Sequence, residues 1–195
     1  MKKPKVHYVD NQALYAAIVK HRKEVAAAVV KGEEPPRIPE FVGECIFKIA
    51  NKLSILPKFV NYSFRDEMVA DAIENCFLYY YDYDPDRADP ETGEITANPF
   101  AYYTQIAFFA FIRRINREEK IRYSAYKSFY FNVVHGNVGS HDTMMLFDDG
   151  EKNLLPATMY DNIAASMSRF EKKEADRKLK REQKKQGLQK FYKDE

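Results

Sequence analysis

The feature that most constrains this fold is a repeated three-and-four spacing of apolar residues, which places them on one face of an α-helix. The spacing runs without interruption from Val69 to Tyr80 and is equally clear from Val42 to Leu53. Glycine is scarce, at 7 of 195 residues, and helix-favouring charged residues are common. The sequence therefore predicts an all-α fold, in which a compact helical domain precedes an extended charged C-terminal helix or tail.

Capping residues mark several helix ends. Asp10 predicts the N-cap of a first helix, and Gly32 predicts its end. Ser63 and Asp66 form an S-x-x-D pattern, which predicts a capping box at the start of the helix that carries the Val69 stripe.

Three segments are predicted along the chain. Residues 1–133 contain the amphipathic helices and form the compact domain, with a turn-rich loop or small hairpin over 84–98. Residues 134–167 are predicted as a loop or linker. Residues 168–195 are predicted as a charged helix with a C-terminal partner-binding tail, because opposite charges recur at the i,i+4 spacing.

Composition excludes several classes of protein. Lysine and arginine number 31 against 29 acids, a formal charge of +2, so any nucleic-acid contact must come from a local basic patch. Cys45 and Cys76 are far apart and outside any CxxC pair, which argues against a disulfide framework and fits a reducing cytoplasm. No stretch approaches the length of a membrane span, so no membrane partner is expected.

An enzyme is not indicated by any motif. The chain has no glycine-rich phosphate loop, no G-x-S-x-G, no H-E-x-x-H and no Cys/His dyad by spacing, so neither catalytic residues nor a cofactor are predicted. His135, His141 and Asp142 resemble the beginning of a metal site, but two imidazoles without a third nearby ligand are usually surface residues. No metal is expected.

A fourth helix is predicted to begin at Asn98-Pro99, as N-cap and first helical residue, and to run to about Glu119. Its aromatic residues exceed what one buried stripe requires, and Arg113 and Arg114 follow them. Exposed rings beside arginines are typical of single-stranded nucleic-acid binding, by base stacking and phosphate contact. The alternative is that the rings are core and the arginines a solvated helix end. The residues alone leave both interpretations open.

The helix before it has an acidic side. Glu67, Asp71 and Glu74 lie opposite the apolar stripe. Exposed carboxylates in this position are either solvated or face a basic protein partner.

Taken in order, an acidic-apolar helix, a loop and an aromatic helix ending in arginines resemble conserved region 2 of the bacterial sigma-70 family. The chain is more similar still to the short, divergent late-transcription sigma factors of T4-type phages. The similar stretches are Tyr8-Val9-Asp10-Asn11, Glu67-Met68-Val69-Ala70-Asp71 and Asn98-Pro99-Phe100-Ala101-Tyr102-Tyr103-Thr104-Gln105. The resemblance covers roughly residues 5 to 135 and implies that residues 1–133 form a region 2-like domain.

The resemblance implies a sigma-like initiation factor that directs host RNA polymerase core to phage late promoters, where it recognises and melts a TATA-like minus-ten element. The residues implied in binding the coiled coil of the largest polymerase subunit are Glu67, Asp71, Glu74, Phe77 and Leu78. The residues implied in binding promoter DNA are Tyr102, Tyr103, Gln105, Ile106, Phe109, Arg113, Arg114, Arg117 and Lys120.

The C-terminal tail also resembles a motif of these phage factors. Leu188, Phe191 and Tyr192 form an L-x-x-F-Y pattern, similar to tails that bind the replication sliding clamp. The resemblance therefore implies a phage sliding clamp and a late coactivator as further partners, in the host cell cytoplasm. The alternative function is a helical single-stranded nucleic-acid-binding protein without a polymerase partner.

Overall fold

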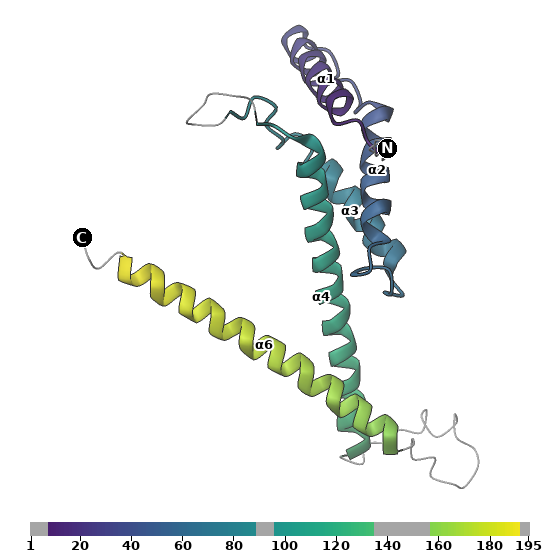
Figure 1. The fold of residues 1–195 in the computed structure, drawn as a ribbon, viewed down its shortest axis with the longest axis vertical. Coiled ribbons are helices and arrows are strands. Elements are labelled where there is room, and N and C mark those ends of the chain that lie inside the picture. The colour runs from purple at the N-terminus through teal and green to yellow at the C-terminus, as the bar shows by residue number, and fades with distance from the viewer. Residues whose placement is uncertain (1–7, 89–95, 135–156, 192–195) are drawn as a thin grey trace, which may run out of the picture. The chain divides into compact units, whose positions relative to one another are not determined.

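The computed structural model describes residues 8–88, 96–134 and 157–191, with the side chains of 132–134, 157, 159, 160 and 186–191 excepted (Figure 1). Within these residues the predicted all-α fold is confirmed, with five helices and no β-strand. The chain divides into two compact units, Met1–Ile115 (unit 1) and Asn116–Glu195 (unit 2). The boundary between the units falls inside a helix, whereas the compact domain was predicted to end at residue 133. None of the described helices combines the length and the apolar character needed to cross a lipid bilayer.

The first helix, α1 (Asn11–Lys31), has the predicted caps. The Asp10 carboxylate accepts hydrogen bonds from the backbone amides of Gln12 and Ala13, at 2.9 and 3.1 Å. Gly32 ends the helix in the left-handed conformation, with φ 71°, which a side chain would strain.

The second helix, α2 (Glu40–Ser54), follows Pro39 and contacts both α1 and the third helix. All five apolar residues of the predicted stripe are buried: Val42, Cys45, Ile46, Ile49 and Leu53.

The third helix, α3 (Arg65–Leu78), begins differently from the prediction. Its N-cap residue is Phe64 and no side chain caps it, so the predicted capping box of Ser63 and Asp66 is wrong. Phe64 packs against the core and against the Tyr62 ring, with centroids 5.2 Å apart. Apolar packing thus sets the start of the helix, while Asp66 stays in solvent beside Arg65.

The fourth helix, α4 (Pro99–Val134), has the predicted N-cap, because the Asn98 side chain accepts from the Ala101 amide at 3.0 Å. Asn11 adds a second cap by accepting from the Phe100 amide at 3.1 Å, which ties the starts of α1 and α4 together. The helix continues well beyond the predicted end near Glu119, as far as Val134. Figure 1 shows α4 as one continuous helix.

The last helix, α6 (Ala157–Phe191), begins earlier than the predicted residue 168. Residues 157–167, predicted as linker, are therefore helical. Ile163 is buried in this segment, so the first turns of α6 take part in apolar packing.

The loop between α3 and α4 is described only in part. The Thr96 amide donates to the Arg87 carbonyl at 2.9 Å, as a small hairpin requires. Residues 89–95 lie outside the described residues.

The core of unit 1 is rich in aromatic rings. Phe59, in the α2–α3 connection, meets Phe108 and Phe111 of α4 edge to face, at 5.7 and 5.1 Å. Such ring pairs contribute roughly 0.5–1.5 kcal/mol beyond their buried area. The connection between two helices is thereby fastened to a third.

His21 is the one buried imidazole of the described core, at 1% exposure. Its Nε2 lies 3.1 Å from the Pro36 carbonyl, which can only accept, so Nε2 carries the proton. Its Nδ1 then accepts from the Tyr80 hydroxyl at 2.9 Å. The side chain joins α1 to the linker before α2 and to the turn after α3.

A buried tyrosine hydroxyl and a buried cysteine thiol should make unit 1 less stable as the pH becomes alkaline. Burial raises the pKa of Tyr103 well above its ordinary value and raises the pKa of the Cys76 thiol to about 12. In the unfolded chain these groups ionise near pH 10 and pH 8.5 respectively, at roughly their reference values. The unfolded state therefore loses its protons first as the pH rises. We expect the free energy of unfolding to be unaffected below about pH 8 and to fall above it, by up to about 1.4 kcal/mol per pH unit for each group.

The variant Tyr103→Phe tests this directly, because the buried Tyr103 hydroxyl has no hydrogen-bond partner within the described residues. We expect the variant to be as stable as the wild type at neutral pH, or up to about 1 kcal/mol more stable. It should also lose less stability than the wild type between about pH 8 and pH 11. Urea denaturation followed by circular dichroism measures both effects. An alkaline loss equal to that of the wild type would contradict the assignment.

Candidate nucleic-acid and protein interfaces

Three of the residues predicted to bind DNA form an exposed row in unit 1. Gln105, Phe109 and Arg113 are spaced four residues apart on α4, so they are neighbours on one helix face. The Phe109 ring is 49% exposed. The Arg113 guanidinium donates to the Asn75 side chain at 2.6 Å, which ties this arginine to α3. We call these three residues the α4 row.

The prediction that Tyr103 contacts a base is wrong, because its side chain is fully buried. It lies on the same face of α4 as Ala107 and Phe111, and all three are inside the core. Its ring packs against those of Tyr83 and Tyr102, at centroid distances of 6.4 and 5.3 Å. The stretch from Asn98 to Gln105 resembles the sigma-factor motif in its residue types, but this resemblance does not determine which of its side chains face solvent.

Tyr102 and Ile106 are half-buried. The Tyr102 hydroxyl donates to the Tyr79 carbonyl at 2.8 Å, and Ile106 packs against the core. Both residues help to hold α4 in place, and their exposed edges flank the α4 row.

Asp71 and Arg114, assigned by sequence to different partners, bind each other. The Arg114 guanidinium meets the Asp71 carboxylate through two hydrogen bonds, at 2.7 and 2.8 Å. The side chains are only 19% and 25% exposed, for Arg114 and Asp71 respectively. The paired geometry is the strong form of this interaction. The assignments of Asp71 to the polymerase and of Arg114 to DNA are therefore corrected to a structural pair between α3 and α4.

The remaining predicted polymerase-binding residues are accessible on α3. Glu67 and Glu74 are exposed, and the apolar Phe77 and Leu78 are 37% and 70% exposed. Exposed apolar side chains with polar neighbours are typical of protein-binding surfaces.

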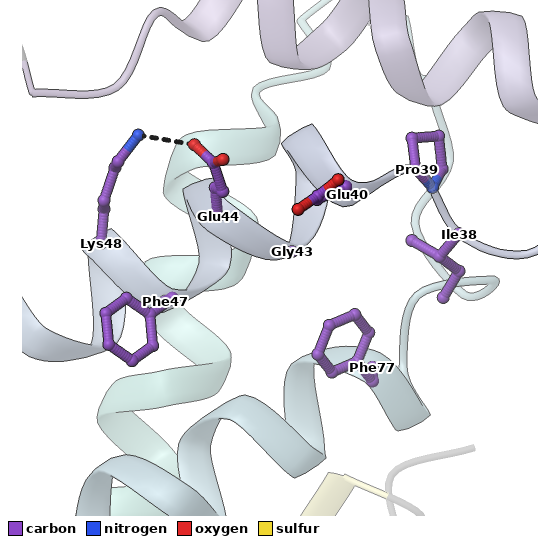
Figure 2. Close-up of a pocket in the computed structure, with 8 residues that line it drawn as sticks. All are labelled: Ile38, Pro39, Glu40, Gly43, Glu44, Phe47, Lys48 and Phe77. Carbon is purple, nitrogen blue, oxygen red and sulfur yellow. Dashed lines mark hydrogen bonds and ion pairs between the residues drawn. The ribbon is translucent and has the colours of Figure 1, made fainter.

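A groove that the sequence analysis did not predict lies between α2 and α3 (Figure 2). The Phe77 ring stands between α3 and Gly43 of α2, and a Cβ atom at Gly43 would lie 3.5 Å from it. Phe47, 56% exposed, lines the same space, and the cavity has a volume of about 410 Å³. Glu44, bonded to Lys48 at 3.1 Å, lies along its rim. The one sign of this groove in the sequence was Phe47, an apolar residue among the charged residues on the outer side of α2.

Other predicted residues lie in unit 2 or outside the description. Arg117 and Lys120 are exposed on the unit 2 part of α4. Leu188 and Phe191 are on α6 but their side chains are not described, and Tyr192 lies outside the described residues, as do His135, His141 and Asp142. Among the residues that the structure does describe, no three His, Cys, Asp or Glu side chains lie close enough together to hold a metal ion.

Neither a scan against models of known protein families nor a search of curated proteins finds a match for this chain. The function is therefore inferred from the motifs and from the surfaces described above.

The Asp71–Arg114 pair can be tested by its effect on folding. We expect Arg114→Ala to lower the free energy of unfolding by about 1–3 kcal/mol, because it leaves a half-buried carboxylate without its partner. Arg113→Ala, which removes an exposed neighbouring guanidinium, should cost less than about 1 kcal/mol and is the matched control. The double variant Asp71→Ala with Arg114→Ala should show coupling of at least about 0.5 kcal/mol in denaturant unfolding. Strictly additive effects would show that the two side chains act independently.

Proposed function

We propose that this protein is a sigma-like initiation factor that directs RNA polymerase core to late promoters by recognising and melting a TATA-like minus-ten element. The observation that carries the proposal is the presence of two chemically different exposed surfaces on the adjoining helices of unit 1. One combines carboxylates with apolar side chains, on α3 and the α2–α3 groove. The other combines an amide, an exposed ring and a guanidinium, in the α4 row.

The first surface suits a protein partner. Glu67 and Glu74 would face basic side chains of the polymerase, and Phe77 and Leu78 would be covered by its apolar side chains. Phe47 extends the apolar area into the groove. Burial of such area contributes roughly 25 cal/mol per Å² before the costs of association. The resemblance to sigma factors supports a helical coiled coil of the largest polymerase subunit as this partner.

The second surface suits unpaired DNA. A ring such as that of Phe109 can stack on a base, which contributes roughly 1–3 kcal/mol. The Gln105 amide can donate to and accept from a base edge, and Arg113 can contact a phosphate. Tyr103 supports this surface from inside the core and does not contact DNA.

A sliding clamp and a late coactivator remain part of the proposal through the resemblance of the tail residues Leu188, Phe191 and Tyr192. The host cytoplasm is where these partners and the polymerase would be met.

A single-stranded nucleic-acid-binding protein without a polymerase partner is the alternative. The α4 row alone would serve such a protein. Its acidic α3 surface would then have no use and would repel DNA nearby. The two functions therefore differ in whether α3 binds a protein.

The polymerase surface is tested by Glu67→Lys with Glu74→Lys. We expect association with bacterial core polymerase to weaken at least about tenfold, because two carboxylates on the contact surface change sign. Asp71 is left unchanged, since its substitution would disturb the pair with Arg114. The matched control is Glu33→Lys with Glu34→Lys, the same charge change at exposed positions of the linker before α2. Undiminished association of the α3 variant would favour the alternative.

The DNA surface is tested by Phe109→Ala and Arg113→Ala in transcription from a supercoiled template that carries a TATA-like minus-ten element. We expect each to reduce correctly started transcripts by about tenfold or more, because a stacking ring or a phosphate contact is lost. Polymerase association should not change. Val30→Ala, at an 89% exposed position of α1, is the control. Normal transcript levels from both variants would exclude the α4 row from promoter opening.

A further inference from the structure

Unit 2 contains a basic surface that the proposed function does not use. In this unit α6 packs against the C-terminal part of α4. The Tyr123 and Phe170 rings are stacked, with centroids 4.5 Å apart and planes 20° apart. Asn116 accepts from Arg177 at 2.5 Å, and Lys173 forms an ion pair with Glu119.

Three carboxylates of unit 2 take part in contacts inside the unit. Glu119 binds Lys173, Glu171 accepts from the Tyr123 hydroxyl at 2.8 Å, and Glu174 binds Arg177 at 2.6 Å. Most of the lysines and arginines are left over. The following exposed cations have no carboxylate partner within the part of unit 2 that the structure describes: Arg122, Arg169, Lys172, Lys178, Lys180, Arg181, Lys184 and Lys185.

Part of this surplus is arranged in a line. Arg169, Lys172 and Lys180 lie along one side of α6, with Asp176 between the two lysines. They line one shallow depression of about 380 Å³. From Arg169 to Lys180 the rise of the helix is about 16 Å. We call Arg122, Arg169, Lys172 and Lys180 the basic strip.

Arg122 joins the strip from α4. It shares with Arg169 a second depression, of about 200 Å³, where α4 and α6 meet. Arg169 also donates its Nε–H to the Ala165 carbonyl at 3.3 Å, which leaves the outer nitrogens of the guanidinium for a ligand. Cations from two helices therefore converge on one side of unit 2.

We propose that the basic strip binds the phosphate backbone of double-stranded DNA without reading its sequence. The inference extends the proposed function, since it supposes that the protein acts on DNA. Duplex DNA presents closely spaced phosphates along a line, which fits a straight row of cations. The Tyr123 and Phe170 rings are stacked on each other, so each ring already has one face covered and neither can lie between two bases.

The same surface is poorly suited to a lipid bilayer. A helix that lies on a membrane needs an apolar face beside its cations. In the described part of α6, Leu179 is the one large apolar side chain that is exposed. On α6, charge without an apolar face favours a polyanion in water.

The test uses the full chain and compares two lysine pairs on one helix. Lys172→Gln with Lys180→Gln removes two cations of the strip. Lys178→Gln with Lys185→Gln removes two exposed cations from the opposite side of α6, with the same change in net charge. None of these four lysines contributes to the contacts that hold α6 against α4, so both variants should keep the wild-type circular dichroism.

Binding is measured by fluorescence anisotropy with two duplexes of unrelated sequence, over a series of salt concentrations. We expect the strip variant to bind both duplexes at least about tenfold more weakly at low salt. Its plot of log affinity against log salt should be shallower by about 2, at roughly 0.9 for each lost phosphate contact. The control pair should change the slope by less than about 0.5.

Any of three results with duplex DNA would overturn the inference. Equal effects of the two lysine pairs would indicate that only the bulk charge matters. The other two results are no effect of either pair and loss of binding to only one of the duplexes. Vesicles of anionic lipid are assayed in parallel, and strip-dependent binding to them without strip-dependent binding to duplex DNA would also overturn it. The assay contains no polymerase. A failure of polymerase association in the separate experiment would therefore contradict only the initiation-factor proposal. Equal salt slopes for the strip variant and the control variant would contradict only the proposal that the basic strip binds DNA.

Discussion

The accessible surfaces of unit 1 depend on one packing interaction, the burial of a single face of α4. Tyr103, Ala107 and Phe111 are spaced four residues apart on this face, and each is fully buried. Phe111 meets Phe59 edge to face, so the α2–α3 connection is held against the same side of the helix. Because each residue of a helix is turned by a constant angle from the last, burial of this face directs the α4 row to solvent.

The Asp71–Arg114 pair has a similar controlling role for charge. A guanidinium and a carboxylate that are both mostly buried lose much of their hydration, and their two mutual hydrogen bonds offset that loss. The pair joins α3, which carries the candidate protein-binding surface, to α4, which carries the candidate DNA-binding row. Each surface therefore rests on a helix whose position the other helix helps to define. Glu67 and Glu74 on α3 and Arg113 on α4 lie outside the pair and are exposed.

Unit 2 is organised on a different principle. It has one ring stack and several polar contacts between α4 and α6, which engage the basic side chains of Lys173 and Arg177 and leave the cations of the basic strip exposed. A net charge of +2 over the whole chain does not reveal this separation, because acids and bases nearly balance in the total. What a partner meets is the local surplus, so a nearly neutral protein can carry a strongly basic strip.

Local patterns in the sequence were sufficient for much of the fold. The caps at Asp10, Gly32 and Asn98 and the buried stripe of α2 were all predicted, because capping and periodicity involve residues a few positions apart. The start of α3 was not, because Phe64 is placed by contacts with distant parts of the core. The candidate site divides in the same way. Its residue types were visible in the sequence, but only the packing of α3 against α4 decided that Tyr103 is buried and that Asp71 binds Arg114. Likewise, only the packing of α2 against α3 placed Phe47 and Phe77 in one groove. Side-chain chemistry belongs to the chain, whereas exposure and pairing arise only when helices distant in sequence pack against one another.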